Sequence, residues 1–139
     1  VTFIAWASFF ILGGKSSGLR QSIASNLTGI AIASLTLLAM SRFNANPLVA
    51  AICVGVGSAT MVQVSKVPLL AAIPAIVWGF ASTVGTSIAT GKSIATPGLA
   101  NPALVAAAAM ILGGVFGYLS EFWGDAMTRS SVSAERTRV

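Results

Sequence analysis

The sequence predicts an all-α integral membrane protein, because its composition is strongly apolar and its apolar stretches have the length of membrane-spanning helices. Hydrophobic residues make up 55% of the 139 positions and charged residues 8%, whereas a soluble domain carries about 25% charged residues. Eight basic and three acidic side chains are too few to cover an aqueous surface of this size. We therefore expect most of the surface to face lipid.

Polar residues divide the chain into five apolar segments, at 1–12, 19–40, 47–64, 68–89 and 101–127. The last four approach the ~20 residues that a helix needs to cross a bilayer. Barrel strands would be shorter and would alternate in polarity, and backbone groups in lipid must bond within their own segment. We expect five transmembrane helices within residues 1–128, followed by a polar, basic and disordered cytoplasmic tail at 129–139.

The pairs Asn46-Pro47 and Asn101-Pro102 mark two helix starts. Each places a capping Asn before a Pro at the first helical position, where the missing N–H costs no helical hydrogen bond.

The first apolar segment is too short to cross a bilayer. A signal-peptide remnant is one interpretation, but no basic region precedes the segment and no small-residue cleavage pattern follows it. A helix that lacks its beginning fits better. We expect the natural chain to start upstream of Val1, with six helices in all.

The basic residues predict the orientation. If the segments alternate, one side of the membrane receives six of the eight basic residues, and the positive-inside rule makes this side and the C-terminus cytoplasmic. Only Arg42 and Lys92 fall on the other side. The six are Lys15, Arg20, Lys66, Arg129, Arg136 and Arg138.

An order of features recurs in the first and fourth segments. Trp6 is followed by Gly14-Lys15-Ser16 and then Asn26, and Trp78 by Gly91-Lys92-Ser93 and then Asn101. The segments lie three helices apart and cross in opposite senses, as the halves of an inverted repeat do in many transporters. The alternative is that the tryptophans are interfacial aromatics and Gly-Lys-Ser a generic loop.

Small and polar residues share one face of the second segment, since Ser22, Ser25, Asn26 and Gly29 recur at three- and four-residue spacing. The Asn26 amide must find partners in another helix or in water. Packing between helices is one interpretation, and a hydrated pathway is the other.

The fourth segment indicates a broken helix. Pro74 stands inside it, and the stretch 82–90 is rich enough in Gly, Ser and Thr to unwind. Broken helices at membrane depth line cavities in many transporters, although a kink accommodated by neighbouring helices is the alternative. We predict a solute pathway lined by Ser25, Asn26, Ser82, Thr83 and Thr86.

The distribution of charge predicts an uncharged solute that moves passively. The chain contains no His, and no Asp, Glu, Lys or Arg lies in the centre of an apolar segment, whereas proton relays and ion-coupled carriers rely on such groups. Near the end of the last segment, Glu121 and Asp125 either receive solute or pair with Arg129, and we favour an Asp125–Arg129 pair.

Other function classes have little support. Metal sites need clusters of His, Cys and carboxylates, and the lone Cys53 lies in an apolar run, so we expect no enzyme, no cofactor and no metal. The basic residues stand singly, which argues against nucleic-acid binding. Gly113 and Gly117 have the Gly-x-x-x-Gly spacing that lets helices approach closely, so we assign them to packing.

Three short motifs carry a resemblance to a known family: Trp6-Ala7-Ser8-Phe9, Gly18-Leu19-Arg20 and Gly114-Val115-Phe116-Gly117-Tyr118. At these motifs the chain resembles a small bacterial inner-membrane family catalogued as domain of unknown function 1097. The resemblance implies a multi-pass bacterial inner-membrane protein whose relatives carry further apolar sequence at the N-terminus, and it implies no activity.

These observations lead to two hypotheses. The first is a channel or facilitator for a small neutral solute, assembled as a homo-oligomer in the lipid bilayer. The second is a non-transporting membrane subunit that anchors or stabilises a larger complex. A water-accessible path within one protomer favours the first, and a dry bundle with a broad interface to another chain favours the second.

Overall fold

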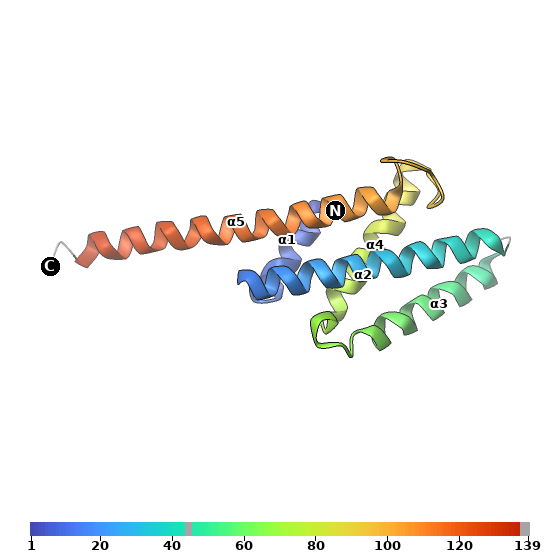
Figure 1. Ribbon diagram of the computed structural model, residues 1–139, viewed down its shortest axis with the longest axis horizontal. Coiled ribbons are helices and arrows are strands. Elements are labelled where there is room, and N and C mark those ends of the chain that lie inside the picture. Colours follow the sequence, from blue (N-terminus) through green and yellow to red (C-terminus); the bar gives the residue numbers. More distant parts are fainter. Residues whose placement is uncertain (44–45, 137–139) are drawn as a thin grey trace.

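The computed structural model describes residues 1–43 and 46–136, and within them the chain forms five α-helices and one short 3-10 helix. Helices α2, α3 and α5 run roughly alongside one another, while α1 and α4 cross them (Figure 1). The elements in chain order are α1 (Thr2–Ile11), α2 (Lys15–Arg42), α3 (Pro47–Val64), η1 (Pro68–Leu70), α4 (Ile73–Thr90) and α5 (Pro102–Arg136).

Four of these helices are long and apolar enough to cross a membrane. They are α2, α3, α4 and the part of α5 up to Thr128. Helix α1 has only 10 residues, fewer than a spanning helix needs. The chain is therefore an all-α protein of membrane type, as the sequence predicts.

Two helices extend further than predicted. Lys15–Gly18, predicted as a loop, forms the first turn of α2, which begins after Gly13 and Gly14 turn the chain with positive φ angles of 86° and 64°. Helix α5 continues past Met127 to Arg136, so the predicted disorder is wrong for residues 129–136; residues 137–139 lie outside the described part. Polar side chains end an apolar segment without ending a helix.

The prediction of a broken fourth helix is also wrong. Pro74 lies in the first turn of α4, where a proline removes no helical hydrogen bond. The stretch 82–90 is regular α-helix. The hydroxyls of Thr83, Thr86 and Thr90 donate to the carbonyl groups four residues earlier, at 3.0, 2.7 and 2.7 Å, and so satisfy themselves within the helix.

Both predicted Asn caps are confirmed. The Asn46 Oδ1 atom accepts the Val49 N–H at 2.9 Å, and the Asn101 Oδ1 atom accepts the Ala103 N–H at 2.9 Å. Asn101 also donates through Nδ2 to the carbonyl groups of Ile94 and Thr96, at 2.8 and 2.9 Å. The second cap therefore also anchors the loop before α5.

Helices α2 and α4 approach to backbone contact. A side-chain carbon on Gly29 would collide with the carbonyl oxygen of Ile76, and one on Gly79 would collide with the carbonyl oxygen of Asn26. Each glycine thus removes a side chain where the other helix passes, the role that small residues play between membrane helices. This pair is the most extensive helix contact of the protein.

Helices α1 and α5 make the second close approach. A side-chain carbon on Gly113 would collide with the Thr2 carbonyl oxygen, and one on Gly117 would lie 2.7 Å from the Phe9 ring. Phe9 is fully buried there. The assignment of Gly113 and Gly117 to helix packing is confirmed.

We predict that Gly79→Ala destabilises the protein by about 3 kcal/mol, the upper part of the usual range for overpacking, since the new methyl group meets rigid backbone. Gly85→Ala in the same helix is the matched control, because no atom lies within 4 Å of the added carbon. The control is expected to leave stability unchanged or to raise it by up to about 1 kcal/mol through helix propensity. Unfolding in detergent micelles measures both, and equal effects would contradict the assigned contact.

Candidate functional site

Three side chains form a buried polar cluster between α1 and α2. The Ser22 hydroxyl donates to the Ser8 Oγ atom at 2.8 Å, and the Asn26 Nδ2 atom donates to the same Oγ atom at 3.2 Å. All three residues are at most 1% exposed. These hydrogen bonds connect α1 to α2. The surrounding bundle is apolar, and an unpaired polar group in such surroundings destabilises the fold by several kcal/mol.

The Asn26 side chain has one defined orientation. Its Nδ2 atom lies 2.8 Å from the Ser22 carbonyl oxygen, and a carbonyl can only accept a hydrogen bond, so the amide nitrogen must face it. The Asn26 Oδ1 atom consequently points away and has no hydrogen-bond partner among the described residues. A buried acceptor is left open to a donor from outside the chain.

Two further buried polar atoms lack a partner within the described part of the chain. They are the hydroxyl oxygens of Ser25 on α2 and Ser82 on α4. Ser25 adjoins Asn26, and Ser82 follows by three positions Gly79, which meets the Asn26 carbonyl at the helix crossing. An unsatisfied buried hydroxyl costs about 1–3 kcal/mol, so water or a polar solute bound here would lower the free energy of the site.

The five residues predicted to line a pathway thus differ in their roles. Ser25, Asn26 and Ser82 are buried and each carries an open polar atom. Thr83 and Thr86 are buried and half-buried, respectively, and their hydroxyls donate to their own helix. Among the described residues, the first three therefore carry a polar atom with no hydrogen bond at all, whereas Thr83 and Thr86 have used their donor.

Sequence reasoning missed Ser8 as a member of this site. Ser8 is fully buried and accepts both hydrogen bonds that cross from α2, yet a single serine within an apolar segment gives no polar periodicity. One signal was available. Ser8, between Ala7 and Phe9, carries the only hydroxyl in the second half of α1, and a polar group at such a position is either buried in the protein or exposed to lipid.

The site has no charged member, and hydrogen bonding is its only polar chemistry. Ser25 and Asn26 lie near the middle of α2, and Ser82 near the middle of α4. Hydroxyl and amide groups at this depth can bind water or a small neutral molecule, but they supply neither a general acid nor a base near neutral pH. Among the described residues, no group of three His, Cys, Asp or Glu side chains could hold a metal ion.

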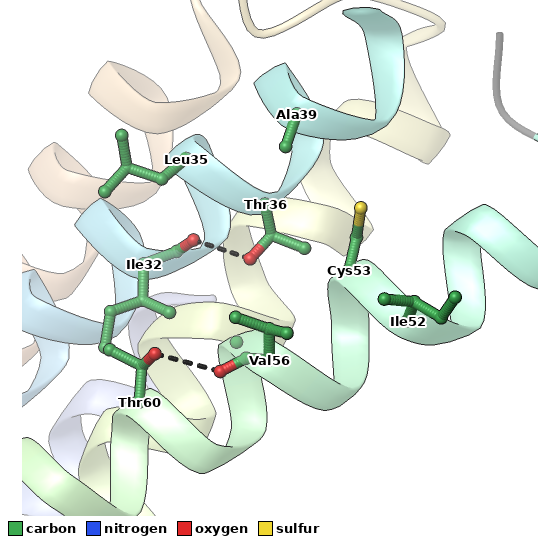
Figure 2. A pocket seen from close by; sticks show the side chains of 9 residues that line it. Ile32, Leu35, Thr36, Ala39, Ile52, Cys53, Val56 and Thr60 are labelled. Carbon is green, nitrogen blue, oxygen red and sulfur yellow. Dashed lines mark hydrogen bonds between the residues drawn. The ribbon is translucent and has the colours of Figure 1, made fainter. Parts of the chain in front are cut away.

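A separate cavity of about 340 Å³ lies between α2 and α3. Figure 2 shows aliphatic side chains along it, and the Thr36 and Thr60 hydroxyls turned back to the carbonyl groups of Ile32 and Val56, each at 2.9 Å. Because these hydroxyls are already satisfied, the cavity presents an apolar surface. It suits an acyl chain better than a polar solute.

At the other end of α2, Glu121 caps the helix. Its Oε2 atom accepts the Lys15 N–H at 2.7 Å, which satisfies an otherwise open backbone donor and places negative charge at a helix N-terminus. The predicted Asp125–Arg129 pair stays a prediction, because the Arg129 side chain lies outside the described part.

Comparison with known proteins gives one match. Residues 1–125 match a family described as protein of unknown function (DUF1097). The chain belongs to this family. The resemblance inferred from the short motifs is confirmed, and the match includes every residue of the buried polar cluster of the DUF1097 protein. No curated protein and no solved structure matches the chain.

We predict that Ser8→Ala lowers the stability of the DUF1097 protein by about 1 kcal/mol, the usual scale of interhelical hydrogen bonds in membranes. The substitution removes the acceptor of both cross-helix bonds. Ser34→Ala is the control, since the Ser34 hydroxyl bonds only to the Ile30 carbonyl of its own helix, at 2.8 Å. Unfolding in micelles should separate the two variants; an unchanged Ser8→Ala protein would show that the cluster does not stabilise the fold.

Proposed function

We propose that this protein is a passive facilitator for a small uncharged solute that exchanges hydrogen bonds with the buried cluster. The observation that carries the proposal is the set of open polar atoms on Ser25, Asn26 and Ser82, near the middle of two membrane-length helices. A solute that carries both donors and acceptors, such as a small amide or alcohol, has the complementary groups. We place the protein in the bacterial inner membrane as a homo-oligomer with a cytoplasmic C-terminus.

We further propose that the fold is an inverted repeat that pairs α1 with α4 and α2 with α5. Gly29 of α2 lies against the Ile76 carbonyl of α4, and Gly113 of α5 lies against the Thr2 carbonyl of α1. If α1 is exchanged with α4 and α2 with α5, the contact between α2 and α4 becomes the contact between α5 and α1. A pseudo-two-fold axis requires this relation. The two most extensive helix pairs, α2 with α4 and α1 with α5, follow the same exchange.

A second contact supports the same register. Gly114 of α5 lies near Leu19 and Ile23 of α2. We align α2 with α5 by pairing Gly29 with Gly113. In this alignment the counterparts of Gly114, Leu19 and Ile23 belong to, or pack against, one apolar cluster. These counterparts are Ile30, Ala103 and Ala107, respectively.

This register differs from the one that the order of motifs predicts. The motifs align Trp6 with Trp78, whereas the helix contacts make Phe80 the counterpart of Trp6. Loop length accounts for the shift of the Gly-Lys-Ser motifs but not for that of the two tryptophans, which lie within α1 and α4: three residues connect α1 to α2 and eleven residues, 91–101, connect α4 to α5. Motifs in the loops therefore lose register with the helices that they join.

The two halves differ in polarity at the proposed site. In the contact register, Ser8 corresponds to Ser82, while the partners of Ser8 correspond to the buried apolar side chains Ala106 and Met110. Ser82 therefore retains the hydroxyl but lacks the bonding partners that its counterpart has. The open hydroxyl of Ser82 on α4 therefore joins the open atoms of Ser25 and Asn26 on α2, which supports a site shared by the two halves.

We predict that Ser25→Ala combined with Ser82→Ala lowers solute flux by about tenfold, the factor that corresponds to about 1.4 kcal/mol in the barrier to passage. The variant should be as stable as the wild type or more stable, because the hydroxyls that it removes have no partner among the described residues. Proteoliposomes assayed with a panel of small amides and alcohols measure the flux.

Ser34→Ala is the control for this experiment, since its hydroxyl is already bonded within α2. Absence of flux in the wild type across the whole panel would reject the facilitator. Flux that persists unchanged in a correctly folded double variant would reject the assigned residues.

The second candidate is a membrane subunit that anchors a larger complex. The observation that favours it is the unbroken α4, packed against α2 with backbone contact, because such a crossing leaves little space for solute. Copurification of one stoichiometric partner, together with absence of flux, would select this function.

A further inference from the structure

An apolar groove lies on the outer side of α1 and α5. Its volume is about 420 Å³, and it is lined by Thr2, Phe3, Trp6, Phe116 and Ser120. Phe3 is 85% exposed and Phe116 is 57% exposed. The Trp6 Nε1 atom donates to the Ser120 Oγ atom at 3.0 Å, so these two polar side chains of the groove are paired with each other.

The corresponding surface in the other half is covered by α3. Gly57 of α3 sits on Ile32 and Thr36 of α2 and on the Phe80 ring of α4, and its added carbon would lie 2.7 Å from the Thr36 Oγ1 atom. Met61 of α3 packs with Ile32 and Ile76 in one apolar cluster. Ile32 and Thr36 are each only 7% exposed beneath this helix.

The two surfaces correspond residue by residue. In the register fixed by the Gly29 and Gly113 contacts, four residues that contact α3 or its apolar cluster have counterparts in the lining of the groove. The pairs are Ile32 with Phe116, Thr36 with Ser120, Phe80 with Trp6 and Ile76 with Thr2. The groove thus has a lining that corresponds to the surface on which α3 packs.

We propose that this groove holds a transmembrane helix of the same polypeptide, encoded directly upstream of Val1. The proposal rests on the repeat proposed above and not on solute passage. In an inverted repeat the occupant runs opposite to α3, and its C-terminal end lies beside the start of α1, as α3 leads through residues 65–72 into α4. In this arrangement the proposed helix has a small residue facing Trp6 and Ser120, just as α3 has Gly57 facing Phe80 and Thr36.

Orientation argues against a second copy as the occupant. A neighbouring protomer inserted with the same topology presents its α3 in the direction opposite to the one that the groove requires. A copy with the reverse topology would present it correctly, but the topology expected from the sequence puts six of the eight basic residues on one side of the membrane, which favours a single orientation.

The test uses the natural gene product in its own membrane, with the photocrosslinker benzoylphenylalanine at Phe116. The expected product is an intramolecular cross-link to a peptide upstream of Val1, identified by mass spectrometry after proteolysis. A second variant with the photocrosslinker at Phe3 should give the same partner peptide, which guards against misfolding of one variant. Ile111, which is exposed on α5 outside the groove, is the control position and should give no such product.

Three results would overturn the proposal: cross-linking to a second copy, cross-linking to another protein, or labelling of lipid alone. A gene that encodes no apolar helix upstream of Val1 would overturn it as well. Because the cross-link reports helix packing and the proteoliposome assay reports flux, failure of the groove assignment and failure of the facilitator are distinguishable.

Discussion

The architecture depends on two places where helix backbones touch. A membrane bundle gains no hydrophobic driving force between its helices, so dispersion contacts and interhelical hydrogen bonds must hold it together. Gly29 and Gly79 allow α2 and α4 to meet, and Gly113 allows α5 to meet α1. These contacts fix the heights at which the helices cross. The α1 and α2 helices that carry the hydrogen-bonded residues Ser8, Ser22 and Asn26 are each held by a glycine contact with a further helix.

The helical membrane-type fold was predictable from the sequence, whereas the shape of α4 and the hydrogen-bond partners of the polar residues were not. Apolar segment length and the Asn-Pro pairs identified the spanning helices, since both are written in consecutive residues. The shape of α4 was not predictable, because Ser and Thr satisfy their hydroxyls within a helix as readily as they line water. Ser25, Asn26 and Ser82 were predicted from residue type and spacing and are buried in the structure, whereas the contact of Ser8 with Ser22 and Asn26 became visible only when α1 and α2 were placed together.

The polar cluster combines rigidity with unused bonding capacity. Ser8 and Ser22 are satisfied by each other and by Asn26, which immobilises the amide and directs its Oδ1 atom to one place. An acceptor held in this way needs no reorganisation to receive a donor, and this preorganisation lowers the cost of binding. Under the repeat proposed above, the counterparts of Ser22 and Asn26 are Ala106 and Met110, which are buried and apolar, so the proposed site would not be symmetric.

The contact between Glu121 and the Lys15 backbone has a consequence for biosynthesis. The two residues are 106 positions apart, and at 5–20 residues per second a ribosome needs on the order of ten seconds to synthesise that distance. Throughout this interval the start of α2 lacks its cap, and the face of α1 that receives Gly113 and Gly117 has no helix against it. Helix α1 is thus synthesised long before it reaches its final packing, and the nascent chain depends on lipid or the insertion machinery to shelter it until α5 arrives.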